Sequence, residues 1–227
     1  MFKVVAATAA FGLVHSALAS RGAKRLAADV CGERNRNGVY RVFYIGQSLA
    51  SFALLAAYIR RQPSMELYRI RGPAKVFAIV FQAAAVGYAT SAAKQIGISR
   101  VLGIECLCNW LGNSDVLPEP EAQGPALDSQ KNAPGTFALS RHPLNFAPLP
   151  IFWLWPKMTS NLLEFNAAAT VYLVIGSLHE EARLREVQGQ RYALYQNSGV
   201  PFFIPNANVP PGPQRRLILQ RILDVFA

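Results

Sequence analysis

Three uncharged, largely apolar runs, each bordered by basic residues, constrain this chain more than any other feature. They cover residues 4–20, 42–59 and 76–93, and each is 17 or 18 residues long. A helix that crosses a bilayer needs about 20 mostly apolar residues, and about 17 can suffice. Each run is therefore predicted to form a transmembrane helix.

Two further apolar stretches lie close together in the second half of the chain. Residues 143–156 are rich in proline and aromatic side chains, and residues 161–178 follow a short turn at Pro156 and Lys157. Together they predict a helical hairpin and bring the expected number of transmembrane helices to about five. The predicted fold class is all-α, a polytopic membrane helical bundle with C-terminal amphipathic helices at the interface. For the first run, a cleavable signal peptide ending near Ala19 is the alternative.

The composition agrees with a membrane protein and excludes other classes. Charged residues make up 16% of the chain and the mean hydropathy is +0.18, whereas soluble domains contain about 25% charged residues. The formal net charge of +10 could indicate a nucleic-acid-binding protein, but the basic residues border apolar runs and do not gather on a polar face. The expected partner is a lipid bilayer and not nucleic acid.

The chain is expected to form a single integral membrane domain over residues 1–227. Its parts are a three-span region (1–100), an interfacial helix with a polar loop (101–139), the hairpin with its following helix (140–205) and an amphipathic tail (206–227). With five spans, sixteen Lys and Arg residues fall on the side of the C-terminus and seven on the other. Because basic residues favour the cytoplasmic side, a cytoplasmic C-terminus is predicted.

Ionisable residues border both ends of the predicted hairpin. Arg141 and His142 precede its first helix, and His179, Glu180 and Glu181 end its second. Two antiparallel helices would bring these groups to the same membrane face, where unpaired ionisable groups are costly and often functional. The alternative is that they are interfacial anchors that pair with one another and with lipid headgroups.

Four ordered motifs surround this hairpin. They are R-H-P at residues 141–143, E-E-x-x-L at 180–184, G-x-x-Y-x-x-Y at 189–195 and P-x-x-x-P at 201–205. This series resembles the C-terminal half of the isoprenylcysteine carboxyl methyltransferase and phospholipid methyltransferase superfamily. The N-terminal half, with His15-Ser-Ala-Leu-Ala and residues 33–40, is similar to the NnrU-like or methanethiol S-methyltransferase-like branch.

The resemblance implies a membrane-embedded methyltransferase that uses S-adenosyl-L-methionine and acts on a small or lipophilic acceptor, a thiol, carboxylate or amine. It implies Arg141 and Glu181 as catalytic residues and no metal ion. The residues implied to bind the cofactor are Arg141, His142, Pro143, Leu144, Asn145, His179, Glu180 and Glu181. Two positions depart from the usual R-H-P-x-Y-x-G pattern, because Asn145 replaces the aromatic residue and Ala147 the glycine.

Two other functions remain open from the sequence. NnrU-like proteins include members that resemble a haem-dependent isomerase, and His142 with His179 would then be alternative haem ligands in an isomerase or redox protein. His15, within the first apolar run, is expected to be a polar contact between packed helices. A non-catalytic structural subunit, with partners in a membrane complex, is the third interpretation.

Overall fold

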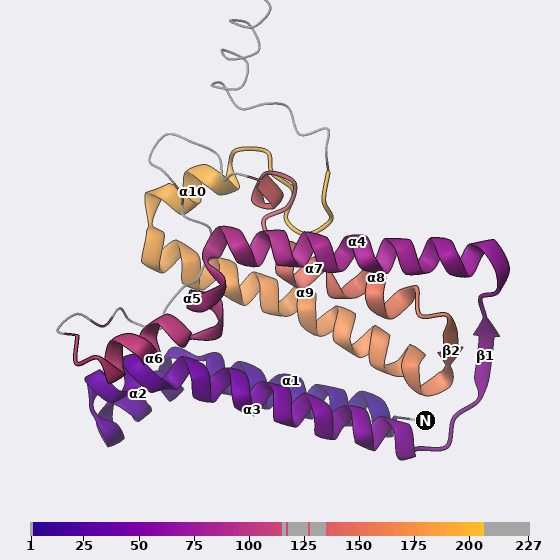
Figure 1. Ribbon diagram of the computed structural model, residues 1–227, viewed down its shortest axis with the longest axis horizontal. Helices are drawn as coiled ribbons and strands as arrows, with labels where there is room; N and C mark the ends of the chain where they lie inside the picture. Colours follow the sequence, from indigo (N-terminus) through magenta and orange to yellow (C-terminus); the bar gives the residue numbers. More distant parts are fainter. Residues whose placement is uncertain (1, 115–116, 118–126, 128–134, 207–227) are drawn as a thin grey trace, which may run out of the picture.

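The computed structural model describes residues 2–114, 117, 127 and 135–206 of the chain. Its four longest helices extend along the length of the molecule (Figure 1): α1 (Lys3–Ala19), α3 (Glu33–Arg61), α4 (Gly72–Ile96) and α9 (Ser160–Gln188). Shorter helices are α2 (Arg21–Cys31), α5 (Ile98–Leu102), α6 (Ile104–Leu111), α7 (Pro143–Phe146), α8 (Pro148–Trp153), α10 (Gln190–Gln196) and the 3₁₀ turn η1 (Gly135–Ala138). The all-α prediction is confirmed.

Three helices in the described part of the chain, α3, α4 and α9, are long and apolar enough to cross a membrane. A fourth candidate is α1 together with α2, which are bent by 56° relative to each other. The bend falls at Ser20, whose hydroxyl accepts a hydrogen bond from the backbone N–H of Ala23 at 3.2 Å and so begins a new helix. The remaining predicted span, residues 143–156, is divided between the short helices α7 and α8 and is not among these candidates.

The outer faces of these helices are apolar, as contact with lipid requires. Exposed large side chains include Phe77 and Phe81 on α4 and Val171 and Ile175 on α9. The inner face of α4 instead carries buried alanines, at Ala78, Ala85 and Ala92. Small side chains let helix backbones approach closely inside a membrane, where exclusion from water does not drive helices together.

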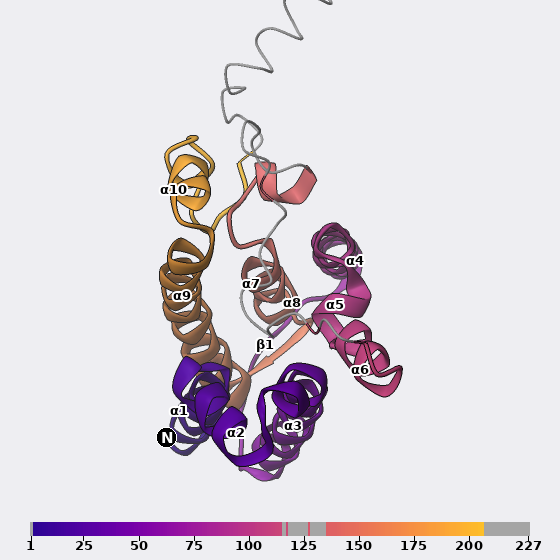
Figure 2. The ribbon, with the colours of Figure 1, turned by 90° about the vertical axis from the view of Figure 1, so that its left-hand side faces the viewer.

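The helices are arranged around an interior, as the end view in Figure 2 shows. Helix α9 packs against α1 and α10, and α1 packs against α3. The broken pair α7 and α8 lies between α4 and α9, which it contacts on both sides, and α6 packs against α3. The segment with the R-H-P motif therefore lies inside the assembly, next to the helix that carries Glu180 and Glu181.

A two-stranded antiparallel sheet joins the chain at one end of the bundle (Figure 1). Strand β1 (Glu66–Arg69) pairs with β2 (Lys157–Thr159), so the loop after α3 meets the turn of the predicted hairpin. The sequence did not indicate these strands, because three or four residues are too few to show an alternating pattern. Thr159 then begins α9, with its hydroxyl accepting a hydrogen bond from the N–H of Leu162 at 3.3 Å.

Two segments outside the candidate spans are helical in the described part of the chain. The start of the region predicted to hold an interfacial helix, residues 101–139, falls on α5 and α6, and the helix predicted to follow the hairpin is the end of α9 together with α10. Most of the predicted polar loop at 113–135 and of the amphipathic tail at 206–227 lies outside the described residues.

Candidate active site at the end of α9

The C-terminal segment after α10 supports the residues around the R-H-P motif. The buried Ser140 hydroxyl donates to the carbonyl of Phe203 at 2.8 Å and accepts from the N–H of His142 at 3.2 Å. The N–H of Arg141 donates to the carbonyl of Pro201 at 2.9 Å. Pro201 and Phe203 both belong to the P-x-x-x-P motif. The backbone of that motif therefore positions the segment that bears Arg141 and His142.

Arg141 forms an ion pair with Glu181 across the two arms of the hairpin. The Nε–Oε1 distance is 2.6 Å, and only 14% of the Arg141 side chain and 12% of the Glu181 side chain are exposed. Nη1 of Arg141 also donates to the carbonyl of Val200 at 2.9 Å. The guanidinium group is therefore held by both a carboxylate and a backbone carbonyl, which a single interfacial anchor would not require.

His142 lies between the two carboxylates of α9, and its side chain is 1% exposed. Nδ1 is 3.3 Å from Oε2 of Glu180, and Nε2 is 3.4 Å from Oε1 of Glu181. The second contact lacks hydrogen-bond geometry, so Nε2 is a buried polar atom without a hydrogen bond. Buried polar groups normally form a hydrogen bond. Because Nε2 forms none, it is available to bond to a molecule bound in the site.

Asn145 links this cluster to the interior face of α9. Its Nδ2 donates to Oγ of Ser177 at 2.9 Å and to Oε2 of Glu180 at 3.0 Å. Ser177 is completely buried, three residues before Glu180, and thus on the same face of the helix. The asparagine that departs from the family pattern is therefore part of the polar cluster.

Two residues of α10 complete the surroundings of Glu181. Nε2 of Gln196 donates to Oε2 of Glu181 at 2.8 Å, and the hydroxyl of Tyr192 donates to Oε1 at 3.4 Å. Burial, and then the charges of Glu181 and Glu180, raise the pKa of Tyr192, so its hydroxyl remains protonated and can donate. The sequence motifs include Tyr192 without giving it a role in the site, and none of them includes Gln196, although Gln196 follows Tyr192 by one helical turn.

The other predicted site residues occupy different environments. Pro143 is buried at the first position of α7, and Leu144 packs against the apolar cluster around Tyr192 and Tyr195. His179 is exposed on α9, whereas His142 is buried beside the glutamates. The structure thus brings Arg141, His142, Asn145, Glu180 and Glu181 together and leaves His179 on the outer surface.

His15 is a polar contact between helices, as expected. Nε2 is 2.5 Å from the hydroxyl of Tyr44, and Nδ1 is 2.9 Å from Oγ of Ser48, both on α3. Since both ring nitrogens are engaged, the histidine has no nitrogen left for a metal ion.

The carboxylates of the cluster favour the binding of a cation. Glu181 pairs with Arg141, and Glu180 contacts His142 and Asn145 and is attracted by Arg183. A cationic group that enters beside Nε2 of His142 would be attracted to both carboxylates. S-adenosylmethionine has such a cation at its sulfonium and another at its amino group, so the residues present fit this cofactor.

Comparison with known proteins gives three related sequences. Over 88 residues the chain is 34% identical to a methanethiol S-methyltransferase of Pseudomonas deceptionensis, a match that covers 39% of this chain and 33% of the relative. A match to the methanethiol S-methyltransferase of Crocosphaera subtropica is 33% identical over 72 residues and covers 32% of this chain and 28% of the relative. Methanethiol S-methyltransferase 1 of Bradyrhizobium diazoefficiens is 28% identical over 106 residues, which cover 47% and 33% of the two chains.

The chain spans about a third of the length of the curated relatives it matches. No family model matches the sequence. No solved structure matches it either. The relatives confirm the predicted resemblance: over part of its length this chain is similar to methanethiol S-methyltransferases, as expected for the isoprenylcysteine carboxyl methyltransferase-like superfamily.

Proposed function

We propose that this protein is a membrane-embedded methyltransferase that uses S-adenosyl-L-methionine and methylates a small or lipophilic acceptor. The observation that carries the proposal is the buried cluster between α7 and α9, in which Arg141, His142 and Asn145 meet Glu180 and Glu181. The named relatives support the reaction class, since all three are methyltransferases.

The residues of the cluster have distinct proposed roles. Glu180 and Glu181 would hold the cationic part of the cofactor, and Nε2 of His142 would bond to one of its polar groups. Arg141 would keep the Glu181 carboxylate oriented through the ion pair already present. When bound, S-adenosylmethionine supplies an electrophilic methyl group, so the protein has mainly to align the acceptor and exclude water.

The acceptor we favour is a small thiol, because each relative is named for transfer to methanethiol. A lipophilic thiol, carboxylate or amine could reach the same interior from the membrane. The cytoplasmic orientation of the C-terminus, inferred from the distribution of basic residues, would place the site within reach of cytoplasmic cofactor.

The test is calorimetric titration of purified protein in lipid nanodiscs with S-adenosylmethionine, combined with a visible absorption spectrum. We expect heat of binding without a Soret band, and methylation of methanethiol detected as dimethyl sulfide by gas chromatography. Absence of cofactor binding by folded protein would contradict the proposal. Binding without methylation of any thiol, amine or carboxylate offered would support the non-catalytic interpretation instead.

The haem alternative is less compatible with the histidines. A bis-histidine haem needs two imidazoles that face one pocket from opposite sides, but His142 is buried between glutamates and His179 is exposed. His15 is bound through both nitrogens to Tyr44 and Ser48. A Soret band in the purified protein would nevertheless restore this alternative.

A further inference from the structure

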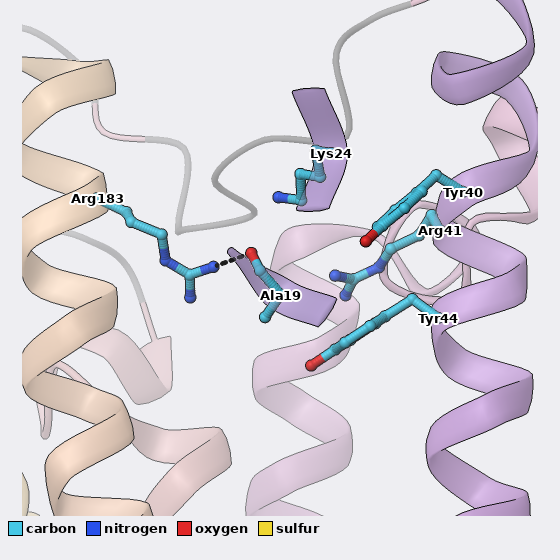
Figure 3. Close-up of a pocket in the computed structure, with 6 residues that line it drawn as sticks. All are labelled: Ala19, Lys24, Tyr40, Arg41, Tyr44 and Arg183. Carbon is cyan, nitrogen blue, oxygen red and sulfur yellow. Dashed lines mark hydrogen bonds between the residues drawn. The ribbon is translucent and has the colours of Figure 1, made fainter. Parts of the chain in front are cut away.

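A second polar feature is a cavity of about 70 Å³ between α1, α2, α3 and α9, whose lining does not include His142, Glu180 or Glu181 (Figure 3). Three cationic residues line it, Lys24 of α2, Arg41 of α3 and Arg183 of α9. The rest of the lining is formed by Tyr40, Tyr44 and Ala19. A water molecule needs about 10–15 Å³ of such volume. The cavity can therefore hold several waters or one small polyatomic group.

Two of the cations, the guanidinium groups of Arg41 and Arg183, are held in place by the backbone around the cavity. Nε of Arg41 donates to the carbonyl of Val101 at 2.9 Å, and Nη1 of Arg183 donates to the carbonyl of Ala19 at 3.1 Å. Each guanidinium has five N–H donors, so these bonds orient the two groups without using all of them. Lys24, only 7% exposed, extends toward the same space in Figure 3.

The electrostatics of the cavity favour an anion. Arg41 and Arg183 are close enough to repel each other, and Glu180, which attracts both, is also engaged by His142 and Asn145. Partly buried like charges are costly unless a counter-charge accompanies them. The hydroxyls of Tyr40 and Tyr44 complete the lining, but they bond to the carbonyl of Leu18 and to Nε2 of His15, so the cationic side chains are the donors that an anion would meet.

The cavity also lies at the level where charged headgroups meet the bilayer. Lys24 follows the bend after α1, Arg41 directly precedes the apolar run of α3, and Arg183 follows the apolar run of α9. We propose that Lys24, Arg41 and Arg183 form a binding site for an oxyanion, a carboxylate or phosphate group, at this end of the bundle. The site does not depend on the proposed methyltransferase activity.

The probe is inorganic phosphate, titrated into the full-length protein in phosphatidylcholine nanodiscs and followed by ³¹P line broadening without S-adenosylmethionine. We expect saturable binding that Arg183→Gln and Lys24→Gln each weaken about fivefold or more, because each loses a charged donor. Matched controls are Arg61→Gln, at the other end of α3, and Arg25→Gln, next to Lys24; both should bind phosphate like the parent. Size-exclusion profiles and melting temperatures show which variants are folded. One folded variant of the cavity, Arg183→Gln or Lys24→Gln, is enough for the comparison with the controls.

Two further arms identify the natural source of the oxyanion. Weaker phosphate binding in nanodiscs that contain phosphatidylglycerol would assign the site to a lipid headgroup, and competition by S-adenosylmethionine would assign it to the cofactor carboxylate. Phosphate binding unchanged by both assigns it to a free anion. No saturable phosphate binding by the parent, or equal binding by the folded cavity variants and the controls, would overturn the proposal.

Discussion

Glu181 is the residue on which most interactions of the candidate site converge. It pairs with Arg141, accepts hydrogen bonds from Tyr192 and Gln196, and lies 3.4 Å from His142. Glu186, on the same helix, instead forms an exposed ion pair with Arg21. Exposed pairs contribute between zero and about 1 kcal/mol, so the two glutamates should respond differently to neutralisation.

We predict that Glu181→Gln abolishes measurable binding of S-adenosylmethionine, whereas Glu186→Gln leaves it unchanged. The substitution removes the carboxylate that balances the cofactor's positive charge and leaves Arg141 unpaired. Titration calorimetry of both variants, with a thermal melt to confirm folding, tests this. Equal effects of the two changes would remove Glu181 from the site.

Arg141→Lys separates a binding role from simple anchoring at the membrane interface. Lysine keeps the charge but cannot hold the Glu181 carboxylate and the Val200 carbonyl with the same planar group. We expect the variant to bind S-adenosylmethionine several-fold more weakly, equivalent to about 1 kcal/mol or more. Cofactor titration of parent and variant measures it, and unchanged affinity would make Arg141 an anchor.

At the scale of elements, the ends of helices position the side chains of the candidate site. Helix α7 is only four residues long, and His142 precedes it as the N-cap with no side-chain cap of its own. A macrodipole needs more aligned peptides than this, so the start of α7 does not by itself attract an anionic group. Gly189 separates α9 from α10 and turns Tyr192 and Gln196 back toward Glu181.

Gly189 should therefore not tolerate a side chain. Its φ of 55° and ψ of −127° are a conformation that costs other residues roughly 1–3 kcal/mol, so Gly189→Ala should lower the melting temperature and weaken cofactor binding. Gly176→Ala is the control, since Gly176 lies within α9 with nothing within 4 Å of an added Cβ. That change should be neutral or slightly stabilising, and a thermal melt of both variants decides the matter.

At the scale of the whole molecule, the two ends of the bundle differ in character. One end carries the β1–β2 sheet, and the other carries α2, α6 and α10 with the His142 cluster and the cationic cavity (Figure 1). The segments predicted to be cytoplasmic therefore lie together. Their common placement agrees with the partition derived from basic residues, while the side of the membrane stays a prediction.

Cysteine labelling tests that orientation. In a background with Cys31, Cys106 and Cys108 changed to Ser, we expect Ser64→Cys to react with a membrane-impermeant maleimide on intact cells. Asn197→Cys, at the opposite end, should react only after the cells are permeabilised. Both positions are exposed, so accessibility to water does not bias the comparison. The reverse pattern would place the C-terminus outside.

Much of the architecture follows from the sequence because membrane helices are determined locally. A long apolar run must satisfy its backbone hydrogen bonds internally, and a helix does so within one segment. The runs at 42–59, 76–93 and 161–178 accordingly lie within α3, α4 and α9. The motifs also predicted that Arg141 and His142 meet Glu180 and Glu181, since a tight hairpin brings its two ends together.

Only the tertiary structure decided the partners that come from distant parts of the chain. The backbone of residues 200–206 supports Ser140 and Arg141, and the cavity joins Lys24 and Arg41 to Arg183. Such contacts depend on how helices are arranged around the interior, which no local pattern specifies. Helix periodicity likewise could not show that His179 faces outward while Glu180, its neighbour, faces His142, because that assignment requires knowing which surface of α9 is covered by α7.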